Sequence, residues 1–334
     1  MALNAFITGA TGFVGSTLAR ELLAAGWNVT ALARAGASRR DLEGFNVRWR
    51  EGDLTQAESL IEAMPADIDC VFHVAADTNV WAPNNERQTR VNVEGTRNII
   101  QAAMRRGAAR FIHTSSFIVW GFQGTPLRET SQRQENADWI NYVRTKHTAE
   151  ELVRAAVRER DFNAVIVNPA HILGPGDRHN WSRMILLVDQ KKLPGIPPGG
   201  GAFADVREIA KAQINAFHSG RKGENYLLGG EDHSFLEVVS IAGELLGRKV
   251  PKRTSPAWLL RLAGQAHQIK SRLTRREPDI TPESVAMITR HIECDSSKAQ
   301  RELGYRFTPV RHLLKDTVDW LRKEGLLRDR EAGK

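Results

Sequence analysis

The chain has 334 residues, of which 41% are apolar and 26% are charged, so it can bury an ordinary globular core. This length predicts one large α/β domain or two unequal ones, and it argues against a repeat array or a disordered chain. The formal net charge of +8 favours anionic partners such as a phosphorylated cofactor, nucleic acid or an anionic membrane face.

The sequence also indicates where the protein resides. It contains no run of about 18 apolar residues, the length that a membrane-spanning helix needs. Cys70 and Cys294 are too isolated for a disulfide framework or a zinc site, which favours a reducing compartment. The apolar start lacks a positively charged region and is interrupted by glycines, so we do not expect a signal peptide. We therefore expect a soluble, cytoplasmic protein.

Short β-branched or apolar runs alternate with helical patterns across the first half of the chain. The expected strands are Asn4–Thr8, Asn28–Ala33, Val47–Arg50, Cys70–Val74, Arg110–Thr114 and Asn163–Asn168. The helical patterns between them include Phe13–Ala25, Thr89–Arg106 and Trp139–Arg160. Strands that alternate with helices of this length predict βαβ crossovers and a parallel sheet covered on both faces.

After Pro169 the pattern changes. Pro194–Gly201 is rich in glycine and proline and predicts a flexible loop, whereas Asn225–Leu228 can form one more strand. Further helices are expected at Phe235–Leu246, Ala257–Arg272, Pro282–Thr289, Ser296–Leu303 and Val310–Glu324. We expect a Rossmann-type, doubly wound nucleotide-binding domain over residues 1–168, with a returning segment at about 205–230. A smaller, mostly helical substrate domain is expected over 169–204 and 231–334.

The turn Gly9–Gly15 follows the first strand and opens the first helix. Glycine permits a tight turn and a close approach of backbone N–H groups to a pyrophosphate, which the positive end of the helix also attracts. Such a G-x-x-G-x-x-G triplet is weak alone, because it can be only a tight connection, but its place between strand and helix favours dinucleotide binding. The expected cofactor contacts here are Gly9, Thr11, Gly12, Phe13, Val14 and Gly15.

The end of the second strand indicates which dinucleotide binds. A carboxylate there would bind the ribose 2′-hydroxyl of NAD, whereas arginine suits the 2′-phosphate of NADP. Arg34, Arg39 and Arg40 all precede the first acid, Asp41. A solvated basic loop would look the same, but the pattern favours NADP(H) over NAD(H).

Two further strand ends are candidates for cofactor contact. Asp53, which precedes Leu54, can accept a hydrogen bond from the adenine amino group or can cap the next helix. The small residues after the fourth strand would let a nucleotide lie against the backbone, or they can reflect close packing. These residues are Val74, Ala75 and Ala76.

Tyr142 and Lys146 are four residues apart and therefore share one face of a helix. A free tyrosine has a pKa of about 10 and exchanges protons poorly at neutral pH unless a nearby cation lowers it. Ser116 follows the strand that ends at Thr114, at the sheet edge where open α/β sheets bind ligands. Its hydroxyl could steady a substrate carbonyl next to the phenol.

Taken in this order, the glycine turn, Ser116, Tyr142 and Lys146 resemble the extended short-chain dehydrogenase/reductase superfamily, also called the NAD(P)-dependent epimerase/dehydratase superfamily, over nearly the whole chain. The resemblance implies that Tyr142 is the acid/base, that Lys146 lowers its pKa and binds the nicotinamide ribose, and that Ser116 orients the substrate oxygen. Asn92 resembles the family's asparagine near the active site. The remaining cofactor contacts that it implies are Thr114, Pro169 and Ile172.

Two enzyme classes within the family compete. Sugar-nucleotide epimerases and dehydratases generally carry an arginine that grips the substrate diphosphate, and no arginine precedes Asp205 in the corresponding segment 199–206. The pattern resembles dihydroflavonol 4-reductases and 3β-hydroxysteroid dehydrogenases more closely. We expect NADP-dependent reduction of a ketone or aldehyde, or oxidation of a secondary alcohol. The alternatives are a nucleotide-sugar epimerase/dehydratase with tightly bound NAD and a non-catalytic NADP-binding sensor or assembly factor.

The remaining expectations concern partners. The stripe Leu259, Leu262, Ala266, Ile269 and Leu273 indicates an amphipathic helix with basic neighbours. Such a stripe is expected to pack on its own domain and cover the substrate pocket. Alternatively, it could rest on an anionic membrane and admit a lipophilic substrate. A homodimer would suit the family, whereas nucleic-acid binding is not expected.

No metal site is expected, because His73, His113, His171 and His179 form no ligand cluster and are interpreted as satisfied structural histidines.

Overall fold

The computed structural model describes residues 2–124 and 126–328 and divides the chain into two compact units. The first unit comprises the described parts of Met1–Ala170, Arg207–Leu228 and Asp295–Arg306. The second comprises those of His171–Val206, Gly229–Cys294 and Phe307–Lys334. The segment 295–306 therefore packs with the first unit, whereas the sequence analysis places it in the second domain.

A seven-stranded sheet forms the centre of the first unit, in the order β3-β2-β1-β4-β5-β6-β9. All of its pairings are parallel, and the order reverses beside β1, as in doubly wound nucleotide-binding folds. This confirms the predicted fold class. The strands are β1 Asn4–Thr8, β2 Asn28–Ala33, β3 Val47–Glu51, β4 Cys70–His73, β5 Arg110–Thr114, β6 Ala164–Pro169 and β9 Asn225–Leu228.

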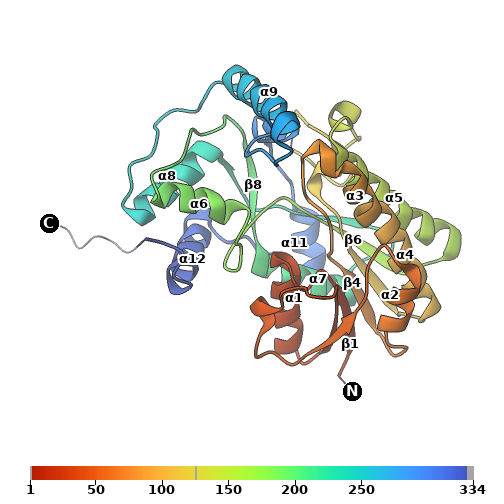
Figure 1. Ribbon diagram of the computed structural model, residues 1–334. Coiled ribbons are helices and arrows are strands. Elements are labelled where there is room, and N and C mark those ends of the chain that lie inside the picture. Colours follow the sequence, from red (N-terminus) through yellow and green to blue (C-terminus); the bar gives the residue numbers. More distant parts are fainter. Residues whose placement is uncertain (1, 125, 329–334) are drawn as a thin grey trace. The chain divides into compact units, whose positions relative to one another are not determined.

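Helices cover both faces of this sheet (Figure 1). Neighbouring residues on a strand point to opposite faces: Phe6, for example, packs into the core formed with α2, α4 and α5. On the other face, Phe72 contacts Trp27, whose ring lies 4.9 Å from that of Phe217 in α7. The helices are α1 Phe13–Ala24, α2 Ala57–Ala63, α3 Asn85–Thr89, α4 Gly95–Arg105, α5 Asn141–Arg160, α7 Val206–Ser219 and α11 Ser297–Leu303.

The helix expected over Thr89–Arg106 is interrupted. A π-helical turn at Arg90–Glu94 precedes α4. Such turns insert one extra residue and re-aim the side chains around them. Short 3₁₀ turns lie at Arg40–Leu42, Ala82–Asn84, Phe117–Trp120 and Glu135–Ala137.

The second unit has its own sheet and its own core. Strand β8 pairs with antiparallel β10 on one edge and with parallel β7 and β11 on the other. Phe203 of β8 and Phe235 of α8 belong to a core completed by α6 and α12. The elements are β7 His171–Leu173, α6 Trp181–Asp189, β8 Gly200–Asp205, β10 Glu231–Ser234, α8 Phe235–Leu246, α9 Ala257–Thr274, α10 Pro282–Ile288, β11 His291–Ile292 and α12 Val310–Lys323.

The expectation of a flexible loop over Pro194–Gly201 is wrong at its end. Gly200 and Gly201 begin β8, every residue of which is buried. A Cβ atom at Gly200 would lie 2.5 Å from the main-chain oxygen of His233 and from a ring nitrogen of His291. These glycines are therefore required by close packing within a sheet, which their composition alone does not reveal.

No helix in the described ranges combines the length and the apolar character that crossing a bilayer requires.

Candidate active site

The β1–α1 turn lies in direct contact with the chain that leaves β4. Gly9 has φ +81°, and a Cβ atom there would lie 2.6 Å from the main-chain nitrogen of Ala75. At Gly15 a Cβ atom would lie 2.2 Å from the carbonyl oxygen of Gly9, so α1 also packs directly on the turn. Gly12, by contrast, has only that oxygen within reach, at 3.4 Å. The first and third glycines are thus fixed by packing, and the middle one leaves an exposed backbone face.

The N-terminus of α1 is suited to an anion. Gly12 is its N-cap and makes no side-chain capping bond, and its first turn holds no acidic residue. The first amides of any helix lack partners within it, so those of Phe13 and Val14 can bind phosphate oxygens. Thr11 is half-buried beside them. This turn can hold the pyrophosphate of a dinucleotide.

The basic residues after β2 are all exposed. Arg34 directly follows the strand, and its carbonyl closes a turn with the amide of Ala37. The guanidinium of Arg39 stacks on the Trp49 ring at 4.9 Å, and Arg40 lies 3.9 Å from Asp41. Exposure leaves Arg34 accessible to a phosphate group.

Most of the other predicted cofactor contacts follow or end strands of the first sheet. The Asp53 carboxylate accepts bonds of 2.8 Å from the amide and the hydroxyl of Thr55, so it fixes the turn before α2. The Leu54 side chain is buried in the core. The chain after β4 is half-buried at Val74, Ala75 and Ala76. Pro169 ends β6, whereas Ile172 lies in β7 of the second unit.

The structure brings Tyr142, Ser116 and Lys146 together. Tyr142 and Lys146 lie one turn apart near the start of α5, and Ser116 caps the 3₁₀ turn that follows β5. The Ser116 side chain lies close enough to the phenol to lower its pKa. The Lys146 ammonium is buried and donates to the Thr114 carbonyl at 2.7 Å, so it lies at the end of β5.

Burial shifts the pKa values of both Tyr142 and Lys146. Desolvation raises the pKa of Tyr142, and the Ser116 side chain opposes this. Desolvation also lowers the pKa of Lys146 to about 8, against the opposing attraction of Glu150. A phenol and an ammonium with perturbed pKa values on one helix face are suited to reversible proton transfer.

Asn92 holds two segments around this site together. Its buried amide oxygen accepts from the amide of Asp77 at 2.7 Å, and its amide nitrogen donates to the Asp77 carbonyl and to Thr145. The π-helical turn aims this side chain at both partners. Asn92 therefore joins the segment after β4 to α5, the helix that carries Tyr142 and Lys146.

Glu150 is the residue that the sequence analysis missed. It lies one turn beyond Lys146, is 3% exposed, and accepts from Ser115 at 2.6 Å and from Asn168 at 2.9 Å. Its other oxygen accepts from Asn225 at 2.8 Å and from Arg154 at 3.1 Å. It thereby ties α5 to the ends of β5, β6 and β9. The i+4 spacing from Lys146 is the signal that could have identified it.

Two of the histidines lie in the first sheet. His73 accepts from Thr8 at 2.8 Å and donates from Nε2 to Thr96 at 2.9 Å, because the Thr96 hydroxyl is already donated to the Asn92 carbonyl. Burial lowers its pKa to about 3, so it is a neutral structural residue. His113 differs from expectation: neither of its buried ring nitrogens has a hydrogen-bond partner among the described residues.

In the second unit, His171 packs in an aromatic cluster with Trp181, Phe203 and Phe235. Burial lowers the pKa of His171 to about 4, which indicates a neutral ring at physiological pH. His179 is exposed.

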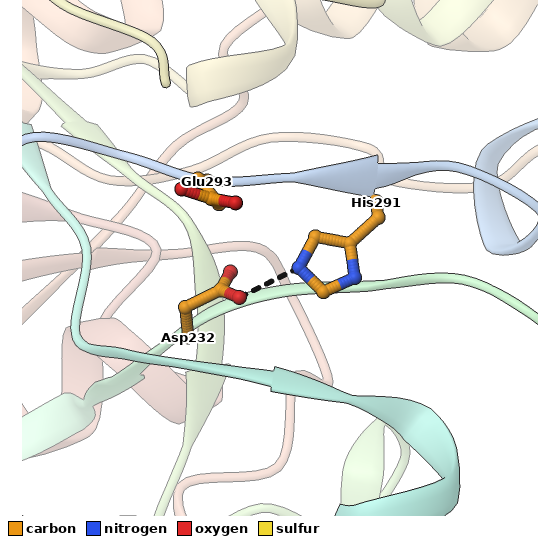
Figure 2. Close-up of side chains that lie close together, drawn as sticks. All are labelled: Asp232, His291 and Glu293. Atoms are coloured by element: carbon orange, nitrogen blue, oxygen red, sulfur yellow. Dashed lines mark hydrogen bonds and ion pairs between the residues drawn. The ribbon is translucent and has the colours of Figure 1, made fainter. Parts of the chain in front are cut away.

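A separate cluster in the second unit holds three side chains with metal-ligating atoms, all within 4.8 Å of one another: Asp232, His291 and Glu293 (Figure 2). No sequence motif indicates this cluster, since Asp232 is far from the other two along the chain. His291 Nε2 lies 2.7 Å from a carboxylate oxygen of Asp232, across the glycines of β8. All three are exposed, and this contact links β10 to β11.

Known proteins are similar to this chain over most of its length. The model of the NAD dependent epimerase/dehydratase family matches residues 5–229. A Synechocystis protein provisionally named dihydroflavonol 4-reductase is 32% identical over 333 residues, 97% of this chain and 96% of its own. Sterol demethylase protein B of Methylococcus capsulatus is 31% identical over 338 residues, 97% of this chain and 100% of its own. The crystal structure of gox2253 is similar with a TM-score of 0.85 and 32% identity, covering 97% of this chain and 99% of that one.

Proposed function

Because the chain belongs to the NAD dependent epimerase/dehydratase family, and is an NAD(P)-dependent oxidoreductase of the extended short-chain type, we propose that it interconverts a ketone or aldehyde and the corresponding alcohol. The observation that carries this proposal is that Tyr142 lies one helical turn from the buried Lys146 ammonium on α5, with the Ser116 side chain close to the phenol. This arrangement provides a proton and a hydrogen bond for one substrate oxygen.

The residues of the β1–α1 turn fit a dinucleotide, since Gly9 and Gly15 leave no room for side chains and the first amides of α1 face outward from an uncapped end. When bound, the nicotinamide supplies the hydride. In the reducing direction, Tyr142 holds a proton at its phenolic oxygen and gives it to the carbonyl oxygen of the substrate. Ser116 donates a hydrogen bond to the same oxygen.

Lys146 acts on the phenol through its charge. When Tyr142 has given up its proton, the phenolate is stabilised by the nearby ammonium, which the Thr114 carbonyl orients. In the oxidising direction the same phenolate takes the proton from the alcohol. Asn92 and Glu150 contribute by positioning: one links α5 to the segment after β4, and the other links it to three strand ends.

We further propose that the cofactor is NADP(H). Arg34 is exposed directly after β2, where the adenine ribose is expected, and the exposed guanidinium of Arg39 is pre-oriented on Trp49. A guanidinium can bind the 2′-phosphate through two hydrogen bonds, whereas the 2′-hydroxyl of NAD favours a carboxylate at this strand end.

The substrate is proposed to be a lipophilic carbonyl or alcohol rather than a sugar nucleotide. No arginine precedes Asp205 to grip a diphosphate, and the carboxylate of Asp205 is instead bonded to Thr308 at 2.9 Å. The two relatives described above are named for a flavonoid reductase and for sterol demethylation. A nucleotide-sugar epimerase with tightly bound NAD is the alternative.

The variant Tyr142→Phe tests the proposal. We expect it to lower the rate of NADPH-dependent reduction of a panel of aromatic and alicyclic ketones by about 10²–10⁴-fold, because it removes the proton donor. NADPH affinity, measured by nucleotide fluorescence, should be unchanged. The matched control is Tyr226→Phe, which removes a hydroxyl bonded to Glu302 outside the site and should leave turnover intact.

Three outcomes would count against the proposal. Equal turnover by Tyr142→Phe and the parent would exclude the phenol as the acid. NADPH binding without reduction of any carbonyl by the parent would favour a binding protein. NAD retained through purification and released only on denaturation would favour an epimerase.

A further inference from the structure

The helix α9, Ala257–Thr274, turns its large apolar side chains to solvent. Five of the nine large hydrophobic residues that are exposed in the described chain lie on it, with exposed fractions between 48% and 83%. We call these five the α9 apolar face: Trp258, Leu259, Leu262, Ile269 and Leu273. The expectation that this stripe packs on its own domain is therefore wrong. Single exposed leucines are ordinary, but a contiguous apolar face of this kind marks an interaction surface.

The opposite side of the helix is what the fold buries. The residues of α9 that are buried are Gly264 and Ser271, which lie two turns apart. A Cβ atom at Gly264 would lie 3.2 Å from Val285 of α10, so the two helices approach closely there. Leu260 and His267 are half-buried on the same face as Gly264 and Ser271, whereas the five residues of the α9 apolar face are exposed. The amphipathic pattern is inverted relative to an ordinary surface helix.

Basic residues flank the α9 apolar face. At about 100° per residue, the five apolar side chains span an arc of roughly 100°. Arg261 and Arg272 border this arc on one side, and Lys270 borders it on the other. The helix contains no Asp or Glu, and no ion pair in the described part of the chain involves the side chains of these three residues. Of the acids that follow, Asp279 is paired with Arg183.

We propose that α9 seats the protein on the surface of an anionic lipid bilayer. An apolar arc that enters the acyl boundary, with long basic side chains on both borders reaching the headgroups, is the arrangement of a helix lying in the membrane plane. Eighteen residues give a rod of about 27 Å, on which Arg261 and Arg272 lie about three turns apart along one border and Lys270 lies on the other. The net charge of +8 adds attraction to an anionic surface.

Charge favours the bilayer over a second copy of the chain. A two-fold contact through the α9 apolar face would place the same patch on both copies. The basic borders would then approach one another with no acid on the helix to neutralise them. An anionic lipid surface supplies the opposite charge along both borders at once.

Vesicle co-sedimentation with the full-length protein tests the proposal without substrate or cofactor, so its result is independent of the proposed reaction. The vesicles are phosphatidylcholine alone, and phosphatidylcholine containing about a third phosphatidylglycerol, each at low and at physiological salt. We expect binding to the anionic vesicles that weakens as salt rises, because the charge contribution is screened. Absence of binding to anionic vesicles at low salt would overturn the proposal.

Paired variants separate the apolar contribution to vesicle binding from the electrostatic one. Leu262→Gln with Ile269→Gln should reduce binding at least tenfold, and Lys270→Gln with Arg272→Gln should reduce it about fivefold per charge on anionic vesicles alone. The controls alter matched residues elsewhere: Phe45→Gln, which is 45% exposed, and Arg160→Gln, at the exposed end of α5. All the changed positions are exposed, and thermal unfolding checks that the fold is retained.

Sedimentation velocity without lipid tests whether a second copy of the chain, and not a bilayer, covers the α9 apolar face. A monomer, or a dimer that persists in Leu262→Gln with Ile269→Gln, agrees with the proposal. If the parent is a dimer and this variant is not, the α9 apolar face serves self-association and the proposal is overturned. Equal loss of vesicle binding in the control variants would also overturn the proposal.

Discussion

The Lys146 ammonium is a charge kept inside the first unit by its bond to the Thr114 carbonyl and by the attraction of Glu150. Burial lowers its pKa to about 8, and Glu150 limits the fall. Burial of this ammonium is unfavourable, and it occurs at the place where a phenolate must form. Ionisable groups with such perturbed pKa values are typical of residues that act in a reaction.

Replacement by methionine tests this role. Lys146→Met should lower turnover and move the pH dependence of alcohol oxidation upward, because Tyr142 then loses its proton without a nearby cation. Steady-state rates between pH 6 and about 10 measure this, with the exposed Lys211→Met as control. An unchanged pH profile would contradict the assignment.

The same variant reports on stability. Between pH 8 and 10.5 the unfolded chain keeps a proton on Lys146 that the folded chain releases, so the free energy of unfolding rises with pH in that window. Relative to Lys146→Met, wild-type protein should gain on the order of 3 kcal/mol at most across it. Urea denaturation at pH 7.5 and 10.5 gives the difference, and a constant difference would contradict a buried ammonium.

At this scale the sequence predicted that Tyr142 and Lys146 share one helix face, but it did not predict the residues that hold this helix in place. Tyr142 and Lys146 share a helix face, so their spacing indicated a pair. The partners of Glu150, namely Ser115, Asn168 and Asn225, are joined only by the parallel pairing of β5, β6 and β9. Such a network cannot be predicted without knowing that pairing.

At the scale of elements, the turn between β1 and α1 requires glycine at position 9 both because of its backbone conformation and because of a close contact. Gly9 and Gly26 both have φ +81°, yet a Cβ atom at Gly26 meets nothing within 4 Å whereas one at Gly9 meets the backbone of Ala75. The two positions therefore form a matched pair that separates left-handed strain from collision.

Both alanine variants should be destabilised by the left-handed conformation, by about 1–2 kcal/mol. Gly9→Ala should lose at least a further 1–3 kcal/mol and most of its NADPH affinity, because the turn must shift away from Ala75. Chemical denaturation and nucleotide titration check this. Equal stability and affinity in the two variants would show that the turn tolerates a side chain.

Element boundaries followed from sequence where the local signal was clear. β1, β2, β5 and β9 have the predicted bounds, because each is a short apolar or β-branched run between turn residues. β8 was missed because its glycines signalled a loop, and the helix at Thr89–Arg106 hid a π-helical turn set by the contacts of Asn92. The periodicity of α9 identified a helix but not which face it buries.

At the scale of the whole molecule, nucleotide binding should appear as added stability. NADPH at about 100 times its Kd should raise the free energy of unfolding by about 2.7 kcal/mol, and NADH at the same concentration should raise it less. Arg34→Ala should abolish that preference, whereas Arg160→Ala at the far end of α5 should keep it. Differential scanning fluorimetry measures both. A preference for NADH, or one that survives Arg34→Ala, would contradict the NADP assignment.

The chain passes five times between its two units, since each unit is assembled from three separate segments. A nascent chain emerging from the ribosome therefore cannot complete the first unit until α11 has been synthesised, when the second unit lacks only its last segment, which carries α12. Long-range pairings of this kind slow folding and prolong the exposure of unpaired strands. Truncation before residue 297 should thus yield an incompletely folded chain that binds chaperones instead of an isolated Rossmann domain. A separate first unit would need linkers in place of residues 171–206 and 229–294.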